Sequence, residues 1–139
     1  MPILRIPDNT EFSTIKIFVH EFELDDRELI PDEFTAAFFN SALAGFGRLR
    51  EHPNCTEICT LGIMETHRKK GIAKKITTEL IQRAKNEIYL VCIIPEFFSQ
   101  LGFSIVDEFP SSMQNKLDYC THSLVVPEKY VVMKYAQTN

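Results

Sequence analysis

A strand-like run, a short basic turn and a helix-like run follow one another between residues 55 and 86, and this succession constrains the fold most. Residues 55–64 read Cys-Thr-Glu-Ile-Cys-Thr-Leu-Gly-Ile-Met, a pattern that predicts a strand. Residues 71–86 predict an amphipathic helix, because apolar side chains recur at helical spacing. This apolar stripe consists of Ile72, Ile76, Leu80 and Ala84.

The turn between these two runs contains a single glycine, Gly71, within a cluster of basic residues. The first N–H groups of a helix have no partner inside the helix, and the helix dipole favours negative charge there. Successive exposed amides also form a concave nest for an anion, and Gly71 lets the backbone approach a ligand closely. The surrounding basic residues are Arg68, Lys69, Lys70, Lys74 and Lys75. The pattern predicts binding of a phosphorylated cofactor.

The common phosphate motifs differ in how well they fit this turn. The spacing of a Walker P-loop is absent, and a Rossmann fingerprint needs three glycines where this turn has one. Residues 68–73 instead read R-x-x-G-x-A. This motif resembles the pyrophosphate-binding signature of the GNAT N-acetyltransferase superfamily.

Two further elements extend the resemblance. Leu61-Gly62-Ile63 is similar to the L-x-V strand end that precedes the turn in that superfamily. Residues 97–103, Phe-Phe-Ser-Gln-Leu-Gly-Phe, resemble its F-Y-x-x-L-G-F element. The two motifs stand in the expected order, with a helix and a strand between them. The resemblance covers residues 34 to about 135.

Length and composition agree with one domain spanning residues 1–139. The chain is 45% hydrophobic, enough to bury one core. No apolar run approaches the ~18 residues of a membrane span, and the N-terminus lacks a signal-peptide pattern. The four cysteines show no paired C-x-x-C spacing, which argues against a metal site and against a disulfide framework. We therefore expect a cytoplasmic protein without a metal.

The net charge of −4 conceals an asymmetry. Residues 8–33 carry nine acidic side chains against two basic ones, whereas residues 68–85 carry seven basic side chains against one acidic one. The basic residues are confined to one helix and no aromatic residue interleaves them, so a phosphate-bearing cofactor explains them better than nucleic acid does. We expect neither a nucleic-acid nor a membrane partner.

The remaining patterns predict an α/β domain with a mixed sheet. Residues 13–23 alternate around Ile15, Ile17 and Val19, which predicts a first strand. Residues 25–32 form an acidic connection or a short helix. The other expected elements are a hairpin of 34–39 and 43–50 (its first arm alternatively a short helix), a turn at 52–54, a buried strand at 88–94, a helix from Pro95 to Gly102, a strand at 103–106, a helix at 111–120 and a strand at 129–135.

The resemblance implies a GNAT acyltransferase fold, with a mixed central sheet that splays between its fourth and fifth strands and is flanked by helices. It also implies acetyl-CoA as co-substrate in that splay, with the pyrophosphate on the turn and the pantetheine arm along the preceding strand. An amine would attack the thioester directly. The implied cofactor residues are Leu61, Gly62, Ile63, Arg68, Lys69, Lys70, Gly71, Ile72, Ala73, Lys74 and Phe98.

The same resemblance suggests how protons move. A backbone N–H near Ile63 would polarise the thioester carbonyl. Glu57 is the candidate for accepting the ammonium proton, with a pKa raised by partial burial, although a surface role is the alternative. Phe98 replaces the tyrosine with which many relatives protonate the departing thiolate. Ser99, Tyr119 or water would substitute, or the thiolate leaves unassisted.

The sequence is compatible with two chemical classes of acceptor substrate. Arg48 and Arg50 share one face of the predicted third strand and would suit the carboxylate of an amino acid, although exposed arginines are the alternative. The acidic segment 21–33 would instead attract a cationic acceptor such as a polyamine or a lysine side chain.

The sequence thus predicts an N-acetyltransferase that acts on a primary amine of a small molecule. The alternatives are a non-catalytic acyl-CoA-binding sensor or scaffold, and a protein lysine or N-terminal acetyltransferase. Phe38, Phe39 and Phe109 are aromatic residues that would support a homodimer if exposed, or the core if buried.

Overall fold

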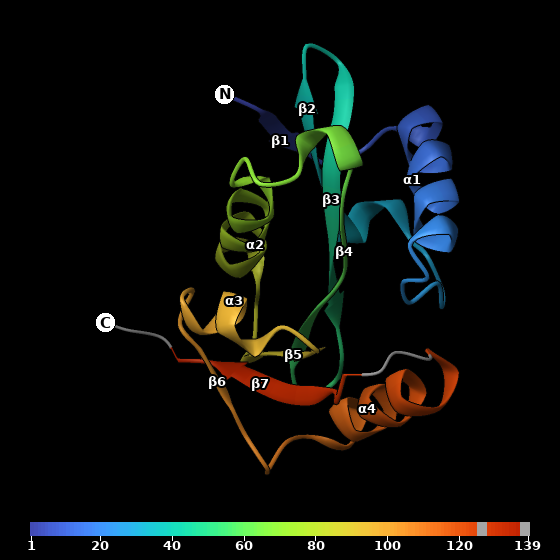
Figure 1. Ribbon diagram of the computed structural model, residues 1–139. Coiled ribbons are helices and arrows are strands. Elements are labelled where there is room, and N and C mark those ends of the chain that lie inside the picture. Colours follow the sequence, from blue (N-terminus) through green and yellow to red (C-terminus); the bar gives the residue numbers. More distant parts are fainter. Residues whose placement is uncertain (125–127, 137–139) are drawn as a thin grey trace. The chain divides into compact units, whose positions relative to one another are not determined.

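The computed structural model describes residues 1–124 and 128–136 (Figure 1). Its strands are β1 (Ile3–Arg5), β2 (Phe34–Phe39), β3 (Ala42–Glu51), β4 (Thr56–Ile63), β5 (Ile88–Cys92), β6 (Phe103–Ile105) and β7 (Val131–Tyr135). Its helices are α1 (Asn9–Glu21), α2 (Ile72–Arg83), α3 (Pro95–Ser99) and α4 (Ser111–Ser123). Single 3₁₀ turns are formed by η1 (Pro31–Glu33) and η2 (Glu65–His67).

The strands form one hydrogen-bonded sheet in the order β1-β2-β3-β4-β5-β7-β6. β4 and β5 pair in parallel, through Thr56 with Ile88 and Glu57 with Tyr89, at the N-terminal ends of both strands. β1 with β2, β2 with β3, β5 with β7 and β6 with β7 pair antiparallel. The predicted α/β fold with a mixed sheet flanked by helices is confirmed.

The chain divides into two compact units. The first comprises residues 1–50 and 58–83, and the second comprises residues 51–57 together with the chain from residue 84 onward. β4 therefore contributes its first residues to the second unit and the rest to the first. Each unit is described by itself.

In the first unit, α1 and α2 cover opposite faces of the strands (Figure 1). On the α1 face, Ile15 and Val19 pack with Phe34 and Phe46 in a fully buried cluster. On the α2 face, a Cβ at Gly47 would lie 2.8 Å from the Ile76 side chain. Phe46 and Gly47 are consecutive residues of β3 and therefore face opposite sides of the strand. Bulky side chains pack on the Phe46 side, and α2 approaches closely on the Gly47 side.

The prediction of a strand at residues 13–23 is wrong, because residues 13–21 belong to α1. The Asp8 carboxylate accepts a hydrogen bond from the Glu11 N–H at 2.8 Å, and Glu11 Oε1 accepts one from the Asp8 N–H at 2.8 Å. This capping box starts a helix that buries Ile15 and leaves Ile17 57% exposed. Three alternating β-branched residues suggested a strand, but the cap and the helical spacing decide the structure. The short strand β1 was not predicted.

In the second unit, the elements expected between residues 88 and 135 are confirmed with small changes in their bounds. β7 lies between β5 and β6, and α4 packs on β5 and β7. Met113 of α4, Tyr89 of β5 and Val132 of β7 share a core cluster with Cys55. α3 begins at Pro95, and Gly102, whose φ is 100°, follows it before β6.

Candidate active site

The turn before α2 has the backbone of an anion nest. Lys69 and Gly71 both have left-handed φ angles, 64° and 78°, and α2 begins directly afterwards at Ile72. A Cβ added at Gly71 would meet no atom within 4 Å, so the space beside this backbone is open. The first turn of α2 contains no acidic residue, and Arg68, Lys69 and Lys70 are exposed. Backbone geometry and charge both fit a phosphate group.

The strand end that leads to this turn is irregular. Thr60, a buried β-branched residue within β4, has a left-handed φ of 53°, and its hydroxyl donates to the Asp25 carbonyl at 3.0 Å. Such a residue interrupts the regular alternation of a strand. Gly62 has no room for a side chain, since its Cβ would lie 2.7 Å from the Phe46 ring. The Ile63 carbonyl accepts a hydrogen bond from Arg68 Nε at 3.1 Å, which ties the strand end to the turn.

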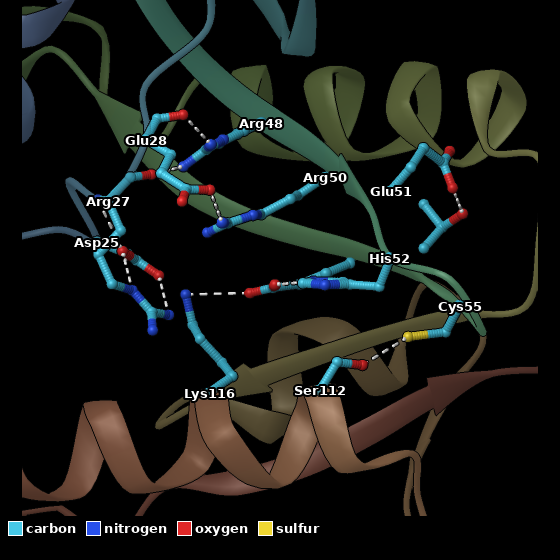
Figure 2. A network of polar contacts seen from close by, with 12 residues as sticks. Asp25, Arg27, Glu28, Arg48, Arg50, Glu51, His52, Cys55, Ser112 and Lys116 are labelled. Atoms are coloured by element: carbon cyan, nitrogen blue, oxygen red, sulfur yellow. Dashed lines mark hydrogen bonds and ion pairs between the residues drawn. The ribbon is translucent and has the colours of Figure 1, made fainter.

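Glu57 lies at the centre of a buried ionic cluster in the second unit. Its side chain is 1% exposed, and Oε1 lies 2.8 Å from His52 Nε2. Oε2 lies 3.0 Å from Lys116 Nζ, an ion pair without the directed geometry of a hydrogen bond. Lys116, labelled on α4 in Figure 2, is ion-paired with one oxygen of this carboxylate, and His52 contacts the other oxygen. The three residues are called the Glu57 cluster below.

The prediction that Glu57 has a raised pKa is wrong. Burial raises the pKa of the Glu57 carboxyl, but the His52 hydrogen bond and the Lys116 ammonium together outweigh burial, so the pKa lies below its usual range. A carboxylate with a low pKa is a weak proton acceptor at neutral pH. Glu57 is therefore an ionised group held by two cationic or hydrogen-bonding partners.

The sequence reasoning missed His52 and Lys116. Lys116 had a detectable signal, because it stands between Met113 and Cys120 at helical spacing and all three are buried in α4. His52 comes five residues before Glu57, across the short turn that separates β3 from β4. A lysine in an apolar helical stripe indicates an acidic partner elsewhere, but its identity does not follow from the sequence.

Cys55 lies beside the Glu57 cluster and shows no sign of reactivity. Its Sγ lies 3.4 Å from Ser112 Oγ, and its side chain is buried. Burial raises the pKa of the Cys55 thiol, which keeps it protonated. Cys55 is therefore a small residue of the core.

Arg48 and Arg50 both hold the segment before β2. Arg48 is 0% exposed, and its three nitrogens bind Glu33 Oε1 at 2.9 Å, the Arg27 carbonyl at 2.7 Å and the Glu28 carbonyl at 2.6 Å. Arg50 binds the Glu28 carboxylate at 2.6 Å (Figure 2). Arg48 is thus not an exposed arginine, and its guanidinium is occupied by protein acceptors. Binding of an acceptor carboxylate by either residue stays a prediction.

Phe98 and Tyr119 both belong to the second unit. The Phe98 ring is buried and packs edge-on against Phe97 and Phe103, with centroids 4.9 and 5.8 Å away. Tyr119 is half-buried on α4. The proposed roles of Phe98 beside the cofactor and of Tyr119 as a proton donor stay predictions.

Within residues 1–124 and 128–136, no group of three or more His, Cys, Asp or Glu side chains is arranged to hold a metal ion. Over the same residues, no helix has both the length and the apolar character needed to cross a bilayer.

The parallel β4–β5 pair, the irregular end of β4 and the open basic turn at the start of α2 define an acyltransferase type of fold. The family model described as "Acetyltransferase (GNAT) family" matches residues 5–103, and the chain belongs to this family. No curated protein sequence matches the chain.

Solved structures of the family share the fold at low sequence identity. N-acetylglutamate synthase from Neisseria gonorrhoeae, complexed with coenzyme A and N-acetyl-glutamate, is 16% identical with a TM-score of 0.78 over 99% of this chain. The match covers 36% of the synthase, so the present chain spans about a third of its length.

Two smaller proteins match over their whole length. Rv2747 from Mycobacterium tuberculosis, in complex with CoA, is 19% identical with a TM-score of 0.79, over 99% of this chain and 100% of its own. Diaminobutyrate acetyltransferase EctA from Paenibacillus lautus was solved in complex with L-2,4-diaminobutyric acid and coenzyme A. It is 13% identical with a TM-score of 0.65, and the match covers 100% of the present chain and 99% of EctA.

Proposed function

We propose that this chain transfers an acetyl group from acetyl-CoA to a primary amine of a small molecule, either an amino acid or a polyamine-like compound. The observation that carries the proposal is the open, basic turn with Lys69 and Gly71 in left-handed conformations, in a chain of the GNAT family. Structures with the same fold have been solved with coenzyme A and N-acetyl-glutamate or diaminobutyric acid.

The cofactor residues follow from the two motifs. The pyrophosphate would lie on the amides at the start of α2, surrounded by the basic side chains of the turn. The pantetheine arm would pair with the backbone of residues 61–63, as an added strand does. The residues proposed for the cofactor are Leu61, Gly62, Ile63, Arg68, Lys69, Lys70, Gly71, Ile72, Ala73, Lys74 and Phe98.

The reaction is a direct displacement at the thioester. The amine nitrogen attacks the carbonyl carbon, the C–N bond forms, and the C–S bond breaks to release the CoA thiolate. A backbone N–H near Ile63 would stabilise the developing oxyanion, an effect of about 2.7–4 kcal/mol in other acyl-transfer enzymes. The ammonium proton must leave before the attack, and the Glu57 cluster is the proposed place where it is accepted. Tyr119, Ser99 or water would protonate the thiolate.

The acceptor class is tested by thiol release from acetyl-CoA with a panel of amines. The panel comprises glutamate, 2,4-diaminobutyrate, spermidine, a lysine peptide and a peptide with a free N-terminus. We expect release with one of the small amines, and none with the Gly71→Glu variant. Release with a peptide alone would replace the proposal by a protein acetyltransferase.

One observation favours a second candidate, an acyl-CoA sensor without transfer. Phe98 has no hydroxyl, and its ring packs against Phe97 and Phe103. The family resemblance implies a proton-donating tyrosine at this position in many relatives. Calorimetric binding of acetyl-CoA without thiol release from any amine of the panel would support the sensor and overturn the enzyme.

A further inference from the structure

The three residues of the Glu57 cluster differ in how far they reach solvent. The Glu57 side chain is 1% exposed and the Lys116 side chain 5%, whereas His52 is 18% exposed. A group that takes a proton from a substrate must be able to contact the substrate. Of these three residues, His52 meets this requirement best.

Resting on the acetyl transfer proposed above, we propose that His52 receives the proton of the acceptor ammonium, and that Glu57 is a positioning residue that orients its ring. His52 Nε2 lies 2.8 Å from Glu57 Oε1. A neutral imidazole has one donating and one accepting nitrogen, so donation from Nε2 to the carboxylate leaves the lone pair on Nδ1. The structure records no partner for this Nδ1 among the described residues.

The charges around His52 support this division of roles. Lys116 of α4 lies 3.0 Å from Glu57 Oε2 and keeps the buried carboxylate ionised. The ionised carboxylate stabilises the imidazolium that forms when Nδ1 takes a proton, and it fixes the tautomer beforehand. Glu51, the nearest acidic residue along the chain, is engaged by the Thr56 hydroxyl at 2.5 Å and by the Asn86 amide at 3.5 Å.

The proton balance is complete without another reactant. The ammonium gives one proton to His52 Nδ1 and becomes the neutral amine that attacks the thioester. The second proton, which the nitrogen loses as the amide forms, goes to the departing CoA thiolate. The imidazolium retains its Nε2–H toward Glu57 and returns the added proton to water after the acetylated product leaves. Glu57 stays a carboxylate throughout, in keeping with its lowered pKa, which burial opposes and its two partners cause. Imidazole chemistry suits proton transfer near neutral pH better than such a carboxylate does.

The test compares His52→Gln with Glu57→Gln and with the control His122→Gln, which alters an exposed histidine of α4. Acceptor kcat/KM is measured from pH 5.5 to 9, and acetyl-CoA binding is measured by calorimetry. We expect His52→Gln to lose about 100-fold in kcat/KM at pH 7, with acetyl-CoA affinity unchanged. The rise of kcat/KM across neutral pH, called the neutral limb of the pH profile, should also disappear. A His52→Ala variant should recover part of its rate with added imidazole.

Glu57→Gln should keep the pH dependence of the wild-type protein but lose part of kcat/KM, because the His52 ring loses the carboxylate that orients it. Retention of the rate and of the neutral limb by His52→Gln would overturn the role of His52 while leaving acetyl transfer standing. Loss of the limb in Glu57→Gln alone would assign the proton to Glu57 itself. Absence of turnover by the wild-type protein with every amine would overturn the transfer reaction, and the role of His52 with it.

Discussion

The turn of residues 68–71 and the Glu57 cluster are built in opposite ways. The turn is exposed, local in sequence and shaped by the backbone, with left-handed φ angles at Lys69 and Gly71. The Glu57 cluster is buried and joins His52, Glu57 and Lys116 through side chains that are up to 64 positions apart (116 minus 52). The turn therefore depends on conformation at one or two positions, whereas the cluster depends on the chemical identity of each member.

The two regions should also respond differently to substitution. An exposed basic side chain of the turn has water as an alternative partner, so its loss costs little stability. A buried charge in the Glu57 cluster has no such alternative once its partner is removed. Substitutions in the Glu57 cluster should therefore reduce stability more than substitutions in the turn do. Substitutions in the turn should in contrast reduce ligand binding more.

The largest expected effect is on folding. Lys116→Met leaves the Glu57 carboxylate buried without its cation, and we expect a loss of about 3–5 kcal/mol in the free energy of unfolding. Lys70→Met, an exposed change of the same type in the turn, should alter it by less than about 0.5 kcal/mol. Urea denaturation at pH 7 measures both, with the double variant Lys116→Met/Glu57→Gln recovering part of the loss. Equal losses in the two single variants would contradict the comparison.

The next effect is on acetyl-CoA binding. Gly71→Glu places a carboxylate beside the expected pyrophosphate at a left-handed φ of 78°, and we expect affinity to fall roughly 100-fold, about 2.7 kcal/mol. The control Thr78→Glu adds the same charge at an exposed position in the middle of α2 and should leave affinity within about threefold. Calorimetry on both folded variants checks this. Equal weakening would mean that overall charge, and not the turn, determines binding.

The same contrast explains what the sequence could and could not predict. The turn, β4 and α2 were predictable because their signals are contiguous, from the strand-like run through Gly71 to the apolar stripe of the helix. Arg48 is different, since its buried contacts with Glu33 and two carbonyls of the preceding segment depend on where that segment returns to β3. Side-chain partners fixed only by the tertiary fold leave no periodic pattern.

Helix α1 shows that local signals can also conflict. The Asp8–Glu11 capping box and the helical spacing of Phe12, Ile15 and Val19 were present in the sequence. The alternation of Ile15, Ile17 and Val19 favoured a strand instead, and a helix interior tolerates β-branched residues when one face is buried. A cap of this kind contributes about 1 kcal/mol. Together with the buried helical face, it outweighs a three-residue alternation.

Acid should weaken the Glu57 cluster and leave the turn intact. Because the folded-state pKa of Glu57 is depressed, its stabilisation is present above the unfolded-state pKa of about 4.3 and is lost as pH falls through the folded value. Glu57→Gln should therefore flatten the dependence of unfolding free energy on pH below about 4.3, by up to about 1.4 kcal/mol per pH unit.

A second carboxyl must be controlled for in that measurement. Glu11 has a pKa of about 2 because of Arg5 and the Asp8 N–H, and its stabilisation is lost over the same acidic range. The Glu57→Gln profile is therefore compared with that of Glu11→Gln, in unfolding experiments between pH 2.5 and 6. An unchanged slope in Glu57→Gln would show that the carboxylate is not held by Lys116 and His52 in solution.

The smallest expected effect concerns salt. Arg68, Lys69 and Lys70 are exposed, so their attraction for phosphate is screened as the Debye length shrinks from about 10 Å at 0.1 M to about 3 Å at 1 M. Acetyl-CoA affinity should fall several-fold over this range, and Lys69→Ala or Lys70→Ala should reduce both the affinity and its salt dependence. The stability difference between wild type and Lys116→Met should stay constant, because a buried pair is screened far less. A stability difference that shrinks with salt would place the Lys116–Glu57 pair in contact with water and remove the distinction between the two regions.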